Sequence, residues 1–575
     1  MKRWRIGGMS SAVLLLLMAA AGCVAAPVYY LNDDVTMRSI LSGACTGTPD
    51  GHAVYMKYPL TGLLAGMYRI SGRMGIFIPW FDLFLAGCIL LAGGAVLTAC
   101  QELWQGSPIR ERLLAGLAGV MVFAALLLPQ YLYLHYTIVA AILAGGALFL
   151  WTSGKARGAA LLMLELCYLV RSQVFFLALP FLLVAVLYNL LHAARRDSAP
   201  RDSILFHCLG RQGISLLILA LVTVLLMGID RIGYSSEAWQ DYREYNASRT
   251  ALYDYTDFLS TDRYQEDYEE LGLDWEQYQV LSHYDTILDQ RIDAQMLDRA
   301  AGNIRRMREA SESGQSFRQW LGTYYRHVRY DGRPYSLVWA CCFTALAVLL
   351  ALYRRWNGLL LMAVLAAGRS AIWIYLMVQG RFPERVWLSL YMIEICLLLG
   401  MLLRECAEGR KAAEGWKRWL PLGVLALCLV LLGGVIPGQL LRTGQEVREQ
   451  QARQDQWNTL IDSLEEKEAS LYLVDVFSAV AYAGEVYEKD SGKVLLLGGW
   501  LTGSPLIQQR LAQHDAADGA GALQHFQVRL LTAGDRDIAW MEDYLEQRLG
   551  AAKLEAQESI ACGDGVEFVV YQLMR

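Results

Sequence analysis

The sequence has little of the charge that a water-soluble chain of its length carries. Asp, Glu, Lys and Arg supply only 19% of the 575 residues, whereas hydrophobic residues supply 55%. A soluble chain this long would divide into several domains with charged surfaces. The low share of charge and the long apolar runs exclude that class and indicate a protein embedded in lipid.

Several motifs of soluble enzymes and nucleic-acid-binding proteins are also absent. The chain has no Walker loop, no Gly-x-Gly-x-x-Gly fingerprint and no internal repeat. Its basic residues form no continuous stripe, so no nucleic-acid partner is predicted. The 12 cysteines show no Cys-x-x-Cys spacing and lie mostly in apolar segments, which indicates neither a zinc site nor a disulfide framework.

Apolar segments of nearly the ~20 residues that cross a bilayer recur along the chain. They predict a polytopic α-helical membrane protein with about 11 spans, of which the fifth is short and forms a bent pair with the sixth. AAAGC, ending at Cys23, resembles a lipoprotein processing site, but the apolar run continues past it and favours an uncleaved helix. The segments lie near residues 10–29, 81–100, 112–129, 132–151, 157–170, 174–191, 213–230, 336–353, 358–378, 385–403 and 419–437.

The distribution of basic residues predicts the orientation. The N-terminal segment and the loops on its side, from Lys2 to Arg418, hold 18 Lys and Arg, whereas the short loops of the opposite side hold seven. Basic loops favour the cytoplasmic side of a membrane. We therefore expect a multi-pass cell-membrane protein with a cytoplasmic N-terminus, and the odd span count places the C-terminal tail outside.

Three predicted outer regions are too long to be simple connections. The first, 30–80, follows the first span, and the second, 231–335, is acidic and rich in Tyr and Trp, which predicts helices with one packed face. Such aromatic rows also stack on sugar rings. The tail, 438–575, alternates β-rich and amphipathic runs, which predicts a small α/β domain after a membrane module, 1–437. Within the tail, GGW at Gly498–Trp500 predicts a tight turn, with or without a ligand.

Two adjacent carboxylates, Asp33 and Asp34, stand directly after the first span. Apolar residues follow at helical spacing, and the pattern resumes after a GTPDG break, which predicts interfacial helices at about 35–43 and 58–70. Two interpretations of the acids stay open. They either cap a helix that begins at Val35 or take part in chemistry.

The acid pair, the interfacial helices and the proline motif KYPLTGLL at Lys57–Leu64 resemble the GT-C superfamily of membrane glycosyltransferases. GRFPERV at Gly380–Val386 resembles a loose version of the superfamily's late arginine motif. The resemblance implies a GT-C fold with an outer C-terminal domain. It also implies transfer of a sugar from a polyprenyl-phosphate carrier to a glycan, lipid or protein acceptor on the outer face, in a bacterial branch whose sugar the motifs do not specify.

The same resemblance implies roles for the two acids. Asp33 would take the proton of the acceptor hydroxyl as general base. Asp34 would orient Asp33 or help to hold a divalent metal such as Mg²⁺ or Mn²⁺. Like charges this close raise the pKa of one member, which suits a base.

The donor phosphate needs positive partners, and basic residues stand at suitable outer positions. Arg381 and Arg385 lie four residues apart at the entrance of a late span, and Arg171 lies near the bend between spans five and six. They predict a charge-assisted phosphate clamp, with interfacial snorkelling as the alternative for the first two. The predicted substrate contacts are His52, Tyr58 and His135.

Two other functions stay open. An O-antigen polymerase or ligase also has about a dozen spans and a large outer loop, where Arg249, His283 and His327 would be its reactive residues. That function leaves the acid pair and the tail unexplained. The other alternative is a non-catalytic membrane protein that binds sugar or lipid on the same scaffold.

The orientation can be tested by cysteine labelling from the outside of intact cells. With native cysteines replaced, single cysteines at Glu244 and Glu555 should react with a membrane-impermeant maleimide, because both predicted outer regions share the side of Asp33. A cysteine at Lys411 should stay unlabelled until the cells are opened. Labelling of the tail only after opening would contradict the predicted orientation.

Overall fold

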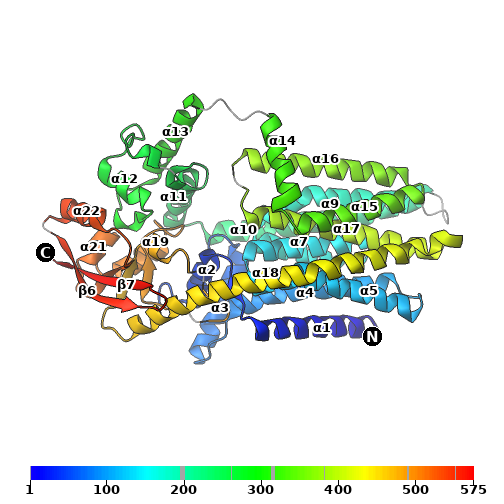
Figure 1. Ribbon diagram of the computed structural model, residues 1–575, viewed down its shortest axis with the longest axis horizontal. Coiled ribbons are helices and arrows are strands. Elements are labelled where there is room, and N and C mark those ends of the chain that lie inside the picture. The colour runs from blue at the N-terminus through cyan, green and yellow to red at the C-terminus, as the bar shows by residue number, and fades with distance from the viewer. Residues whose placement is uncertain are drawn as a thin grey trace.

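The computed structural model describes residues 2–194, 201–260, 262–311, 317–380, 382–412, 414–482, 484–488, 491–550 and 552–574. Within these residues the chain forms a long helical bundle with a mixed sheet and a second helical group at one end (Figure 1). The predicted architecture, a polytopic helical membrane protein with a small C-terminal α/β part, is confirmed.

The bundle contains nine helices, within the described residues, that are long and apolar enough to cross a membrane. Two shorter apolar helices complete the set, so each of the predicted segments falls on a helix. The helices of the bundle are α1 (Lys2–Val24), α4 (Trp80–Leu103), α5 (Ile109–Val122) with its continuation α6 (Leu128–Leu132), α7 (Tyr136–Ser153), α8 (Arg157–Val170), α9 (Ser172–Ala193), α10 (Arg201–Gly233), α15 (Tyr335–Leu352), α16 (Trp356–Val378), α17 (Glu384–Ala412) and α18 (Leu420–Glu465).

Two helices form the centre of the bundle. The apolar window of α7 is 100% buried and that of α17 is 94% buried, whereas α10 and α18 leave most of theirs on the outside. Small residues let α7 and α17 approach closely, since a methyl group added at Gly145 would lie 2.8 Å from the carbonyl oxygen of Met392. This rigid centre fixes the outer end of α7, where one part of the candidate site begins.

The first outer region contains the two interfacial helices that the sequence predicts, α2 (Asn32–Ser42) and α3 (Tyr58–Arg73). Its α2 begins three residues earlier than predicted and therefore includes both acids in its first turn. Apolar side chains of α3 and the following loop, including Leu63, Ile70 and Phe77, stay exposed, as expected for a helix that lies on lipid.

The large outer region, predicted as 231–335, divides into two parts. Its helices α11 (Glu237–Tyr253), α12 (Trp275–Ser282) and α13 (Ala294–Ser311) gather beside the C-terminal domain, as Figure 1 shows. The remaining helix, α14 (Phe317–Arg326), packs against α16 instead, where the Tyr324 and Ser370 hydroxyls lie 3.0 Å apart.

The C-terminal domain is built on a five-stranded sheet of order β4-β3-β5-β7-β6. Its first three neighbours pair in parallel and its last three are antiparallel. The four predicted strands are present, and β6 is an additional edge strand that its alternating polar residues concealed. The elements are β3 (Leu471–Val474), α19 (Val476–Ala479), β4 (Val494–Leu496), α20 (Pro505–Ala512), α21 (Gly519–Leu523), β5 (Val528–Ala533), α22 (Ala539–Leu549), β6 (Lys553–Ala561) and β7 (Glu567–Met574).

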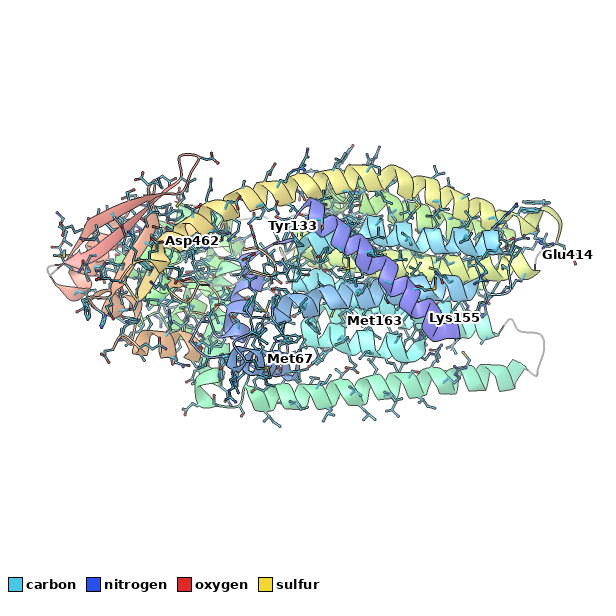
Figure 2. The ribbon with its side chains drawn as sticks, turned by 90° about the horizontal axis from the view of Figure 1, so that it is seen from below. Met67, Tyr133, Lys155, Met163, Glu414 and Asp462 are labelled. Atoms are coloured by element: carbon cyan, nitrogen blue, oxygen red, sulfur yellow. The ribbon has the colours of Figure 1, made fainter. Side chains whose placement is uncertain are left out.

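One helix joins the bundle to this domain. The predicted boundary after residue 437 falls inside α18, which continues without a break to Glu465. In Figure 2, Lys155 and Glu414 lie at the end of the bundle opposite to Asp462. Loops predicted as cytoplasmic thus share one end, and α18 carries the chain to the C-terminal domain at the other.

Candidate functional site

The position of the acid pair is fixed by a short parallel pairing between two strands of two residues each. Strand β1 (Val28–Tyr29) pairs with β2 (Tyr133–Leu134), and the backbone N–H of Tyr30 donates to the carbonyl oxygen of Leu134 at 2.8 Å. Because β1 leads directly into α2 and β2 leads directly into α7, the first turn of α2 lies against the start of α7. This is the junction of the first outer loop with the centre of the bundle.

Asp34 is entirely buried at this junction. Its Oδ1 accepts a hydrogen bond from the backbone N–H of Tyr136 at 2.9 Å, and its Oδ2 lies 3.0 Å from Nδ1 of His135, a ring that is also buried. Burial raises the pKa of the Asp34 carboxyl, which the neighbouring His135 partly opposes. Asp34 therefore holds α2 to α7 through a buried acid–imidazole pair.

Asp33 has a different environment, although it is the next residue. It is half-buried, and no hydrogen bond or ion pair joins it to another described residue. The N-cap of α2 is Leu31, with no side-chain cap bond, so neither acid caps this helix in the manner of the structural alternative. The Asp33 carboxylate instead lies close to Tyr55, whose pKa is raised by burial and, secondarily, by this negative charge.

The charges of two arginines from different elements act on Tyr55. The Arg171 guanidinium, at the bend between α8 and α9, lies 5.0 Å from the ring centroid of Tyr55 and 5.3 Å from that of Tyr136. Its Nη1 is buried without a hydrogen-bond partner. Arg249 of α11 is also buried, and its Nη1 donates to the hydroxyl of Tyr284 at 2.5 Å. Together with Asp33, these groups make a polar cluster at the outer end of the bundle. We call it the Tyr55 cluster; its members are Asp33, Tyr55, Arg171 and Arg249.

The C-terminal domain closes this cluster. The Trp500 ring packs against the Tyr55 ring at a centroid distance of 4.7 Å, and the Trp500 carbonyl oxygen accepts from the Tyr242 hydroxyl at 2.5 Å. Gly498 permits this approach, since an added methyl group would overlap the carbonyl oxygen of Tyr284. The GGW turn is thus required by close packing between the domain and the outer loop.

The late arginines lie at another side of the acid pair or outside the described residues. Arg385, in the first turn of α17, is near enough to Tyr30 for its charge to act on that hydroxyl. The Tyr30 ring stacks on His135 at 5.7 Å and its hydroxyl donates to Glu384 at 3.3 Å. Arg385 therefore lies near the Tyr30 ring that stacks on His135. Arg381 lies outside the described residues.

His52 and Tyr58, two of the predicted substrate contacts, lie together at the base of the first outer loop. The His52 ring is 2.6 Å from Asp50 and 3.0 Å from the carbonyl oxygen of Gly233, and it stacks on Trp239 at 4.4 Å. The Tyr58 ring packs beside it at 4.9 Å. These contacts join the loop to α10 and α11, and they occupy both ring nitrogens of His52.

The site contains residues that sequence reasoning did not assign to it. Tyr55 was absent from the prediction, and Arg249 entered only through the polymerase alternative. Of that alternative's three residues, Arg249 alone meets the Tyr55 cluster, because His283 stacks on Trp540 and His327 packs against aromatic rings beside Arg369. The signal that could have assigned Arg249 to the site is its position within an outer loop rich in tyrosine.

A divalent metal at the acid pair finds no suitable donor set. Within the described part of the chain, no three His, Cys, Asp or Glu side chains gather around one point. Asp34 is engaged by His135 and Tyr136, and the charge of Asp33 acts on tyrosine hydroxyls. No step of the proposed transfer is therefore assigned to a metal.

The unequal environments of the two acids can be tested through stability. Asp34→Ala should lower the free energy of unfolding by about 1–3 kcal/mol, because it leaves a buried N–H and a buried imidazole unpaired. Asp33→Ala should change it by less than about 0.5 kcal/mol. Unfolding of both purified variants in one detergent, followed by intrinsic fluorescence, measures this. Equal effects would contradict the assignment.

Comparison with known proteins gives a distant likeness. No protein-family model and no curated protein matches the chain. The crystal structure of ArnT from Cupriavidus metallidurans bound to undecaprenyl phosphate is similar to it with 14% identity and a TM-score of 0.40, covering 98% of this chain and 97% of that chain. The apo structure of ArnT from Cupriavidus metallidurans is similar over the same shares, with 13% identity and a TM-score of 0.41. Similarity this low carries no argument about chemistry, which must come from this chain's own residues.

Proposed function

We propose that the chain is a membrane glycosyltransferase of GT-C type, which moves a sugar from a polyprenyl-phosphate carrier to an acceptor at the outer membrane surface. The observation that carries this proposal is that the charges of Asp33, Arg171 and Arg249 all act on Tyr55. A carboxylate that is not paired with any described residue, and two arginines around the same tyrosine, supply both charges that the transfer needs. The position at the end of the bundle is where a lipid-linked phosphate would be held.

The transfer is a displacement at the anomeric carbon. The acceptor hydroxyl oxygen forms a bond to that carbon while the bond from the carbon to the phosphate oxygen breaks, and the electron pair leaves with the phosphate. Asp33 takes the proton of the attacking hydroxyl. The carboxylate is accessible for this step because no protein donor occupies it, whereas Asp34 is engaged with Tyr136 and His135.

Negative charge grows on the phosphate as the bond breaks, and the arginines stabilise it. Arg171 is suited to this role because its buried Nη1 has no protein partner, and buried donors pair with something in a working state. The charge of Arg249, from the outer loop, also acts on Tyr55. Arg385 and, by sequence position, Arg381 would meet the carrier phosphate first, at the entrance of α17, before it reaches Arg171. The outer loops that carry the site are held in position by contacts of three side chains, those of His52, Tyr58 and His135.

Asp33→Asn tests the base. Turnover should fall about 100-fold or more, the usual scale for a lost general base, while expression and lipid binding change little because Asn keeps the shape. The assay follows release of polyprenyl phosphate from a radiolabelled donor by the protein in lipid nanodiscs. Near-normal turnover would return Asp33 to a surface role.

Arg171→Ala tests the phosphate site. The KM for the lipid donor should rise about tenfold or more, since a charged hydrogen bond contributes about 1.5–3 kcal/mol. Arg171→Lys should recover only part of this loss, because Lys lacks the planar fork. Arg73→Ala, which removes an exposed charge from the same outer surface, is the matched control and should leave KM unchanged. An unchanged KM in Arg171→Ala would contradict the assignment.

A further inference from the structure

A cavity lies behind α2, the helix that carries the acid pair. It has a volume of about 230 Å³ and is enclosed by α2, by the outer part of α18 and by the C-terminal domain. Asn32, the neighbour of Asp33, stands on its wall, and so does Trp500, whose ring packs on Tyr55. The cavity and the Tyr55 cluster therefore share the first turn of α2 and one tryptophan as their boundary.

The lining of this cavity excludes an anionic ligand. Glu485 and Glu488 both line it, and the pKa of Glu485 is raised by burial and by the nearby Glu488 charge. Arg38 is the one cation among the described lining residues. Its Nη1 donates to the carbonyl oxygen of Glu485 at 2.6 Å and lies 3.7 Å from Asp82, so its charge is already matched. The Tyr55 cluster, with two arginines, has the opposite electrostatic character.

The rest of the lining has the chemistry that recognises sugars. Trp457 and Tyr482 form a stacked pair at 5.0 Å, which offers an aromatic surface to the apolar face of a ring. Beside it, the Gln454 amide donates to Asn458 at 3.0 Å, and Thr36 adds a hydroxyl. Amides and hydroxyls both donate and accept, as the hydroxyl groups of a glycan do.

The cavity also lies away from the lipid. Gln454 follows Pro437 by 17 residues on one continuous helix, a rise of about 25 Å at 1.5 Å per residue. Position 437 is where the predicted last span ends. A ligand that enters between α18 and the C-terminal domain therefore approaches from the aqueous side, whereas the carrier approaches Arg171 from the bundle.

We propose that this cavity binds a neutral glycan, which is the acceptor of the transfer. This inference rests on the proposed glycosyltransferase function and names its acceptor class. The sugar residue at the inner end of the glycan passes Trp500 and presents its hydroxyl to Asp33. The acidic lining of this cavity and the two arginines near Tyr55 would keep the neutral acceptor and the anionic carrier in separate places.

The test is direct binding, measured on the full chain in nanodiscs by saturation-transfer difference NMR. The probes are neutral oligosaccharides of hexoses and N-acetylhexosamines and, in a second arm, oligogalacturonates of equal length. Neutral probes should show saturation transfer and oligogalacturonates should not. Asn458→Trp, which fills the cavity, should weaken binding of the neutral probes about tenfold or more.

Thr459→Trp is the matched control, since Thr459 is the next residue of α18 and is exposed outside the cavity. It should bind as the unaltered chain does. Absence of neutral-probe binding, stronger binding of the oligogalacturonates, or unchanged binding in Asn458→Trp would each overturn the inference. Release of polyprenyl phosphate is measured separately, so failure of the glycosyltransferase function itself appears as lost donor turnover in a chain that still binds glycans.

Discussion

The buried pair of Asp34 and His135 is the constraint on which the arrangement at the outer end of the bundle depends. It joins the first turn of α2 to the start of α7, the most buried helix of the bundle. A buried carboxylate is costly unless it is paired, so this contact strongly favours one orientation of α2. With α2 fixed in this way, Asp33 faces Tyr55 and Asn32 faces the cavity beside α18.

Asp33 and Asp34 are chemically alike but have different roles. They are adjacent in the helix, so their side chains point in different directions and meet different neighbours. Asp34 accepts a hydrogen bond from Tyr136, lies against His135 and positions the helix. Asp33 is half-buried and has no hydrogen bond or ion pair to another described residue. The buried Nη1 of Arg171 is the complementary feature on the opposite wall.

The long helix α18 extends this arrangement to the C-terminal domain. It leaves the bundle and continues to Glu465, shortly before the first strand of the sheet, so the domain lies beyond the end of the bundle where α2 is found (Figure 1). The GGW turn then reaches the Tyr55 ring, and Gly498 allows backbone to pass where a side chain would collide. The domain thus completes the site as one of its walls.

The sequence by itself determined the elements that local pattern controls. Apolar runs located the helices of the bundle, the period of 3.6 residues after the acid pair located α2 and α3, and alternating runs located four of the five strands of the C-terminal sheet. The acid pair itself was visible because two charges beside a span are costly without a role.

Only the tertiary structure decided how these elements share a site. The hydrogen bond from Tyr242 to Trp500 joins residues 258 positions apart, and nothing in either local segment indicates the other. The same holds for the different environments of Asp33 and Asp34, since Asp34 meets His135 and Tyr136 beside the β1–β2 pairing and Asp33 does not. Periodicity reports which face of a helix is buried, whereas the partner on that face is set by the packing of distant elements.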